Sequence, residues 1–246
     1  LCCCRKPKSS FSNIKIYIGR IFKVDLVVMK TALVFGSSGL VGGHLLNQLI
    51  ENDNYNKIKI FVRSEPKNHN PKVKIVKTDF NNLENHKEDI KGDDCFFCIG
   101  TTKQNSPDKN EYRRVELDIP KEIAQIAKSN SLSSFVFVSS GFADPKNSGD
   151  YLKFKGQVEE ELKKLSFQKL GIVRPSFLLG DRKEKRIGEK IGILIFKLLS
   201  PLFVGPLKKM KPIHSEKVAK AMINICNNEH SKVIFESNEI VELVKN

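Results

Sequence analysis

The sequence predicts an α/β fold in which a doubly wound parallel sheet carries helices on both faces. From residue 31 onwards, short apolar runs that fit strands alternate with longer segments of helical spacing. Several of the short runs are apolar throughout, as is typical of strands that are covered on both faces of a parallel sheet. The chain has 246 residues, which is enough for one domain of this class with a small additional lobe.

The expected elements follow one another in a regular rhythm. Strands are predicted at residues 31–35, 58–62, 73–77, 95–99, 135–138 and 170–173. Helices are predicted at residues 40–50, 112–128, 151–165 and 215–226. Such alternation predicts parallel neighbours that are joined by right-handed crossovers. After Pro175 the pattern loosens, and we expect a small C-terminal substrate lobe formed mainly by residues 176–214.

The N-terminal residues 1–28 are treated as an extension outside the fold. Residues 1–30 hold seven of the 42 basic residues but one of the 28 acidic residues. This composition fits a targeting segment, a disordered extension, translated upstream sequence or part of a longer chain, and these alternatives stay open. We expect residues 29–246 to form a single domain in the cytoplasm, with organelle targeting by residues 1–28 as the alternative.

The formal net charge of +14 does not predict nucleic-acid binding. Beyond residue 30, the lysines are spread among glutamates and aspartates, and aromatic residues are not interleaved with a basic stripe. A basic surface also favours small anionic ligands, such as a phosphorylated cofactor.

The cysteines and histidines do not predict a metal or redox site. Cys95 and Cys98 have the spacing of a metal-binding or redox pair, but both fall in a predicted strand. Side chains three residues apart on a strand point to opposite faces, so the two thiols should diverge. The five histidines lack the spacing of metal ligands.

A glycine-rich turn lies between the first predicted strand and the first predicted helix. Residues 36–42 read Gly-Ser-Ser-Gly-Leu-Val-Gly. In such a turn Gly36 permits the tight bend, Gly39 lets the backbone approach a pyrophosphate, and Gly42 lets the helix pack closely. The free N–H groups at the start of the helix then bind the phosphates. This segment therefore predicts that the chain binds a dinucleotide.

The end of the second predicted strand reads Val62-Arg63-Ser64. NAD-selective sites usually place a carboxylate here for the ribose hydroxyls, whereas an arginine suits the 2′-phosphate of NADPH. Arg63 therefore favours NADPH over NADH, although the nearby Glu65 leaves NADH open. An arginine that is simply solvated at a strand end is the alternative interpretation.

A tyrosine and a lysine lie four residues apart on a predicted helix, so Tyr151 and Lys155 should share one face. A nearby ammonium lowers the pKa of a phenol and lets it exchange a proton near neutral pH. Ser139 and Ser140 end the preceding strand, where a hydroxyl could hold a substrate carbonyl. Alone, this tyrosine–lysine spacing is common among surface pairs, but here it follows the glycine turn and the two serines.

At this point the chain resembles the short-chain dehydrogenase/reductase superfamily, and within it the atypical branch typified by the Tat-interacting oxidoreductase-like proteins. The resemblance covers about residues 30–225. It is carried by four blocks: Gly-Thr-Thr at 100–102, Ser-Ser-Gly at 139–141, Tyr-Leu-Lys-Phe-Lys-Gly-Gln-Val-Glu at 151–159, and Arg-Pro-Ser-Phe-Leu-Leu-Gly-Asp-Arg at 174–182.

The resemblance implies a Rossmann-like fold and an NADPH-dependent oxidoreductase that reduces a carbonyl. It implies catalytic roles for Tyr151, Lys155 and Ser140, with Ser139 as the alternative serine. The positions that it implies for the cofactor are Gly36, Ser38, Gly39, Leu40, Val41, Gly42, Arg63, Ile99, Gly100, Lys155, Leu178 and Arg186.

The chain also departs from the superfamily pattern. Residues 99–102 read Ile-Gly-Thr-Thr where typical members have an Asn-Ala-Gly block, and the expected substrate lobe is short. Some members of this branch bind the cofactor yet act as regulators. The alternative function is therefore an NADPH-binding regulatory or scaffold protein, and the partner is either a small carbonyl compound or a regulatory protein. A monomer and a homodimer both fit.

The apolar residues 187–203 are too short and too interrupted to span a bilayer, because Lys197 and Pro201 break the run. We expect a buried or interface helix there, with weak contact to a membrane surface as the alternative.

Overall fold

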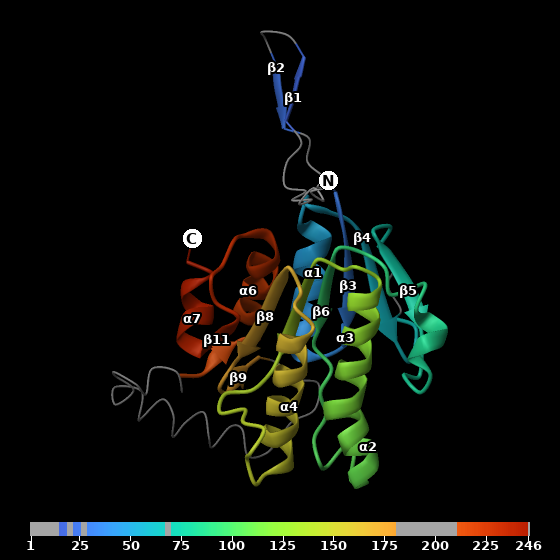
Figure 1. Cartoon of the computed structure of the whole chain (residues 1–246), viewed down its shortest axis with the longest axis vertical. Helices are drawn as coiled ribbons and strands as arrows, with labels where there is room; N and C mark the ends of the chain where they lie inside the picture. The colour runs from blue at the N-terminus through green and yellow to red at the C-terminus, as the bar shows by residue number, and fades with distance from the viewer. Residues whose placement is uncertain (1–14, 19–21, 26–28, 67–69, 181–210, 246) are drawn as a thin grey trace, which may run out of the picture.

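The main sheet is parallel throughout, and it lies between two layers of helices (Figure 1). The computed structural model describes residues 15–18, 22–25, 29–66, 70–180 and 211–245. Within these residues, seven strands pair in the order β11-β8-β7-β6-β3-β4-β5. They are β3 (Lys30–Phe35), β4 (Tyr55–Val62), β5 (Val73–Lys77), β6 (Asp94–Phe97), β7 (Ser134–Val138), β8 (Lys169–Arg174) and β11 (Ile234–Glu236). The predicted doubly wound α/β class is confirmed.

The strand order reverses between β3 and β6. From β3 the chain builds outward through β4 to β5, and it then returns to β6 and builds the other half of the sheet. Ligands of open parallel sheets bind in the crevice that this reversal leaves at the carboxyl ends of the strands. The segments that follow Phe35 and Phe97 therefore border the expected site.

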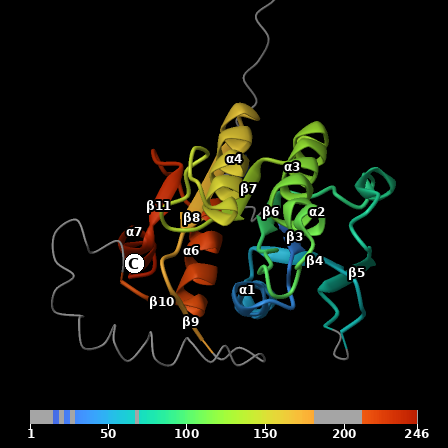
Figure 2. The same ribbon diagram turned by 90° about the horizontal axis from the view of Figure 1, so that it is seen from below.

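Helices cover both faces of the sheet, as Figure 2 shows from below. One face is covered by α1 (Leu40–Glu51), α6 (Ser215–Asn227) and α7 (Ser237–Glu242), with α1 packed against α6. The other face is covered by α3 (Ile119–Ser129) and α4 (Asp150–Lys164), which also pack together. Before α3 come the 3-10 helix η1 (Leu83–His86), α2 (Lys109–Arg113) and the π-helical turn η2 (Arg114–Asp118).

Alternate residues of each central strand enter opposite halves of the core. On β3, Leu33 and Phe35 face α3 and α4, whereas Ala32 and Val34 face α1 and α6. The rings of Phe35 and Phe61 stack with centroids 4.2 Å apart. Because both faces are buried, the strands are apolar throughout, and this explains why they were recognisable in the sequence.

Several predicted boundaries need correction. The fourth predicted strand ends at Phe97 instead of residue 99, because the chain leaves the sheet after the Cys98 N–H has donated to the Phe35 carbonyl and packs against Gly36. The helix predicted at 112–128 begins at Lys109, where the Asp108 carboxylate accepts hydrogen bonds from the N–H groups of Asn110 and Glu111. The short β11 and α7 were not predicted.

Some predictions fall in part on residues outside the described set. Within the N-terminal extension, β1 (Lys15–Ile18) and β2 (Phe22–Asp25) form an antiparallel pair. In the expected substrate lobe, β9 (Leu178–Leu179) pairs in parallel with β10 (Ile213–His214). Residues 181–210, with Arg186 and the apolar run 187–203, lie outside the described residues. In the part of the chain that is described, we find no helix long and apolar enough to cross a membrane.

The two central cysteines diverge as predicted. Cys95 lies in the core half beneath α3 and α4, whereas Cys98 packs against the opposite half. Both are free thiols, and burial raises the pKa of Cys98 to about 12. Among the described residues, no cluster of three or more histidine, cysteine or carboxylate side chains is suited to hold a metal ion.

Candidate functional site

The glycine turn brings three backbone segments into contact where β3 ends. Gly36 has a φ of +88°, a conformation that side chains other than glycine rarely adopt. A Cβ atom at this position would lie 2.8 Å from the Cys98 carbonyl carbon and 2.8 Å from the Ile99 nitrogen. Both the conformation and the space therefore require glycine at position 36.

The start of α1 packs onto the same turn. A Cβ atom on Gly42 would lie 2.0 Å from the Gly36 carbonyl oxygen, so this position also excludes a side chain. By contrast, a Cβ atom on the adjacent Gly43 would lie 3.7 Å from the Ser37 oxygen, which is an ordinary contact. The close approach between turn and helix thus depends on Gly42.

The first turn of α1 is suited to bind an anion. The helix begins at Leu40 after Gly39, its first turn holds no acidic residue, and no side chain of the described residues caps it. Ser38 and Gly39 are exposed, whereas the Val41 side chain is buried in the core. The N–H groups at this end are therefore open to a ligand, and the helix dipole favours phosphate there. The residues present fit the pyrophosphate of a dinucleotide.

Arg63 lies directly after β4, the strand that pairs with β3 on the side away from β6. Its side chain is exposed, and no carboxylate of the described residues forms an ion pair with it. The structure thus places an exposed cation at the same edge of the sheet as the glycine turn.

The loop after β6 connects the turn to the predicted catalytic residues. Ile99 lies against Gly36, and the following Gly100 faces two side chains. A Cβ atom on Gly100 would lie 3.4 Å from Glu116 Oε1 and 3.9 Å from Lys155 Nζ. The glycine turn and Lys155 are therefore separated by one short loop.

Tyr151 and Lys155 lie one turn apart on α4. The Lys155 Nζ lies 5.9 Å from the centre of the Tyr151 ring and 4.9 Å from the centre of the Phe137 ring. Lys155 is buried, whereas Tyr151 is 39% exposed. The structure therefore brings a buried cation close to a phenol that a ligand can reach.

Glu116, which was not among the predicted site residues, lies beside Lys155. Its Oε2 lies 3.0 Å from Lys155 Nζ, and its Oε1 accepts a hydrogen bond of 2.5 Å from the Thr101 N–H. The side chain is fully buried and belongs to the π-helical turn η2. A signal was present in the sequence, because Glu116 shares helical spacing with the apolar residues Tyr112 and Ile119.

The charge of Lys155 depends on its neighbours. Burial alone would lower the pKa of the ammonium, but attraction to Glu116 and Tyr151 outweighs burial and raises it. Lys155 is therefore a charged ammonium at neutral pH, although it is shielded from water.

The two predicted serines have different surroundings. The buried Ser139 hydroxyl donates to Glu159 Oε1 at 2.5 Å, and Glu159 is also bound by Arg174. The half-buried Ser140 hydroxyl donates to the neighbouring Gly141 carbonyl at 3.2 Å. Ser139 is therefore buried and held by Glu159, whereas Ser140 is half-buried and makes the longer of these two hydrogen bonds.

Leu178 lies in the segment that follows β8. It lies in β9 and is half-buried. Two residues later, a Cβ atom on Gly180 would lie 2.8 Å from Leu40 Cδ1, at the start of α1. The segment that contains Leu178 thus passes beside the glycine turn.

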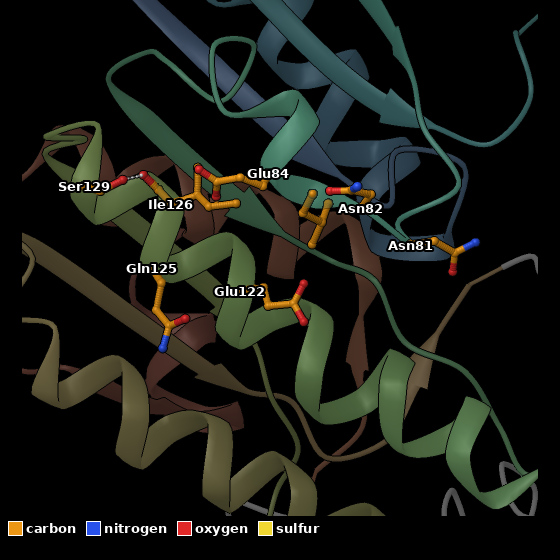
Figure 3. A pocket seen from close by; sticks show the side chains of 8 residues that line it. Asn81, Asn82, Glu84, Glu122, Gln125, Ile126 and Ser129 are labelled. Atoms are coloured by element: carbon orange, nitrogen blue, oxygen red, sulfur yellow. Dashed lines mark hydrogen bonds between the residues drawn. The ribbon is translucent and has the colours of Figure 1, made fainter.

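A separate surface pocket lies between η1 and α3 (Figure 3). It has a volume of about 430 Å³ and contains none of the predicted site residues. Its lining residues are Asn81, Asn82, Leu83, Glu84, Glu122, Gln125, Ile126 and Ser129.

Comparison with known proteins identifies the family. The chain matches a family model described as NAD(P)H-binding over residues 36–229, which include the glycine turn, Arg63, Glu116, Tyr151 and Lys155. This chain belongs to the NAD(P)H-binding family. NAD(P)H binding, the coarser form of the cofactor prediction, is therefore confirmed.

Relatives within the family agree with the resemblance seen in the sequence. The chain is 32% identical over 166 residues to the rat (Rattus norvegicus) protein HTATIP2, covering 65% of this chain and 67% of that protein. It is 30% identical over 222 residues to the protein FMP52 of Eremothecium gossypii, covering 87% of this chain and 97% of that protein. The predicted relationship to the oxidoreductase-like branch is confirmed.

Solved structures share the fold of this NAD(P)H-binding chain. The Bordetella bronchiseptica enzyme WbmH, solved with NAD⁺, aligns with a TM-score of 0.65 at 16% identity, covering 87% of this chain and 79% of that one. A short-chain dehydrogenase/reductase superfamily protein from Agrobacterium tumefaciens, with bound NAD, aligns with a TM-score of 0.62 at 15% identity, covering 83% and 76%. At these identities the likeness concerns the fold.

The expected cytoplasmic location is corrected by the same comparisons. The FMP52 proteins of Eremothecium gossypii, Debaryomyces hansenii and Emericella nidulans are all named as mitochondrial proteins. Location is specified by targeting signals that do not shape the fold, so the pattern of strands and helices carries no information about it.

Replacing Gly42 by alanine tests the packing of the turn. We expect Gly42→Ala to lower the free energy of unfolding by about 1–3 kcal/mol, because its Cβ overlaps the Gly36 carbonyl, and to reduce the stabilisation by added NADPH. Gly43→Ala is the matched control, since alanine fits there and favours the helix by roughly 0.5–1 kcal/mol. Thermal unfolding with and without NADPH measures both effects, and similar behaviour of the two variants would contradict this interpretation.

Proposed function

We propose that the chain is an NADPH-dependent oxidoreductase that reduces a carbonyl compound, with Tyr151 as the proton donor. The observation that carries the proposal is the exposed Tyr151 phenol beside the buried Lys155 ammonium, one loop away from the glycine turn. When bound, NADPH supplies the hydride for the carbonyl carbon. The residues of the chain bind the cofactor and substrate and move the proton.

Each residue has a role that follows from its surroundings. The open N–H groups at the start of α1 hold the pyrophosphate, while the loop at Ile99 and Gly100 borders the cofactor between the turn and Lys155. The half-buried Ser140 hydroxyl orients the substrate oxygen. Tyr151 donates a proton to that oxygen, and the adjacent Lys155 ammonium stabilises the phenolate that remains.

The preference for NADPH over NADH rests on Arg63. Its exposed guanidinium at the end of β4 matches the position at which this fold meets the ribose 2′ substituent. An arginine forms strong, charge-assisted hydrogen bonds to a phosphate, which NADH lacks at this position.

A second candidate function is an NADPH-binding regulatory protein without turnover. Two observations favour it: residues 99–102 lack the Asn-Ala-Gly block, and the names of the relatives HTATIP2 and FMP52 state no reaction. Stabilisation of the protein by NADPH, without oxidation of NADPH by any carbonyl compound, would favour this second function.

The role of Tyr151 is tested by replacing it with phenylalanine. NADPH oxidation is followed with an aliphatic aldehyde, an aromatic aldehyde, a cyclic ketone and an ortho-quinone. We expect Tyr151→Phe to lower kcat/KM on the order of 10²–10⁴-fold, because the general acid is lost while the ring remains. NADPH binding by the variant, measured by thermal shift, should stay as in the wild type. Equal turnover of the two proteins would exclude the proposed role.

The cofactor preference is tested by thermal-shift titration with NADPH and NADH. We expect Arg63→Ala to weaken NADPH binding roughly tenfold or more, as is usual for a lost hydrogen bond to a charged group, and to leave NADH binding unchanged. Arg113→Ala, which removes an exposed arginine paired with Asp118 in the π-helical turn that follows it, is the matched control and should bind as the wild type does. Stabilisation of the wild type by NADH alone would overturn the assignment.

A further inference from the structure

The buried ion pair between Glu116 and Lys155 needs an explanation other than stability. Their side chains are 0% and 4% exposed, and the charged atoms lie 3.0 Å apart. Removing two charges from water costs several kcal/mol for each ion, and apolar residues of similar size often stabilise a fold as well or better. The buried ion pair therefore indicates that Glu116 and Lys155 serve the function of the site.

The backbone around Glu116 supports the same view. Residues 114–118 form a π-helical turn between two α-helical segments, within an otherwise continuous helix. Such turns are rare, and they occur frequently at functional sites. Here the turn carries the acidic side chain that reaches across to α4.

Glu116 joins two parts of the site that are far apart in the sequence. One carboxylate oxygen accepts the Thr101 N–H in the loop after β6, and the other contacts Lys155 on α4. The same carboxylate lies 3.4 Å from where a Cβ atom on Gly100 would be. A movement of Glu116 would therefore disturb both the loop beside the glycine turn and the lysine beside Tyr151.

The titratable groups around Lys155 come from three other segments and from its own helix. They are Tyr151 on α4, Glu116 on η2, Cys98 after β6, and Tyr112 on α2, which faces Glu116 and Tyr151 and is also influenced by Asp150. Burial raises the pKa of both Cys98 and Tyr112, so these two groups stay neutral at ordinary pH. Glu116 therefore supplies the negative charge that balances Lys155.

We propose that Glu116 is the positioning residue of this site: it holds Lys155 charged beside Tyr151 and keeps the proton of the Tyr151–Lys155 pair in place. The inference rests on the proposed function, in which Tyr151 must be protonated to act as a donor. Removing a buried negative charge favours loss of a proton from either neighbour, whichever of the two releases it first. Glu116 thus extends to higher pH the range in which the Tyr151–Lys155 pair keeps both of its protons.

The experiment compares Glu116→Gln with the wild type without cofactor or substrate. The phenol carbon of tyrosine is isotope-labelled, and the signal of Tyr151 is assigned with Tyr151→Phe and followed by NMR as pH rises. We expect the Tyr151–Lys155 pair to lose its proton about one pH unit lower, or more, in Glu116→Gln. In the pH profile of NADPH-dependent turnover, the fall in rate at high pH should move to lower pH by the same amount. A purely structural role of Glu116 would not move this fall.

Glu122→Gln is the matched control. Glu122 lies in the next part of the same helix and binds Arg114 at a partly exposed position away from Lys155. This variant makes the same chemical change and should titrate as the wild type does. A folded Glu116→Gln protein with the titration of the wild type and of Glu122→Gln would overturn the proposal.

A second variant keeps the test decisive if Glu116→Gln does not fold. Glu116→Asp retains the charge but is one methylene shorter, so it cannot hold both Thr101 and Lys155 at their present distances. We expect a smaller downward shift of the same titration, and a folded Glu116→Asp protein without any shift would overturn the proposal. The titration uses no substrate. If the wild type reduces no carbonyl compound, the proposed function is refuted, but the effect of Glu116 on the titration of the Tyr151–Lys155 pair is still measured.

Discussion

The contact between Gly36 and the chain that follows β6 is the constraint on which the rest of the site depends. β3 and β6 are neighbours in the sheet, and the segments that follow them separate at the reversal of strand order. Gly36 fills this junction so closely that no Cβ atom fits against Cys98 and Ile99. The turn fixes where α1 begins on one side, and on the other side it borders the loop that leads to Glu116 and Lys155.

The position of Tyr151 is set by charges buried along α4. Lys155 is paired with Glu116 of the π-helical turn η2. One turn later on α4, Glu159 is bound by Ser139, which follows β7, and by Arg174 of β8. Breaking a buried pair by removing one partner typically costs about 3–5 kcal/mol, whereas an exposed pair contributes about 0–1 kcal/mol. These internal contacts hold α4 in place, and the exposed Tyr151 lies at the start of the same helix.

Much of the fold and of the cofactor turn could be predicted because their signals are local. The central strands are apolar throughout, and Gly36 and Gly42 lie at fixed spacing between a strand and a helix. Helical spacing could place Glu116 on a buried face, but its pairing with Lys155 could not be predicted, because it depends on a π-helical turn and on the packing of two helices. The end of β6 was placed two residues too late for a similar reason, since the approach of Gly36 decides it.

The most direct test of the central claim is amide hydrogen exchange of the protein with and without NADPH. We expect slower exchange at residues 38–42 and 99–101, because a bound ligand protects the N–H groups of the turn and of the adjoining loop. The end of α6, where the Cys226 carbonyl accepts a hydrogen bond from Lys30 Nζ at the opposite end of β3, should exchange at an unchanged rate. Protection that is absent from residues 38–42, or confined to the pocket between η1 and α3, would contradict the account.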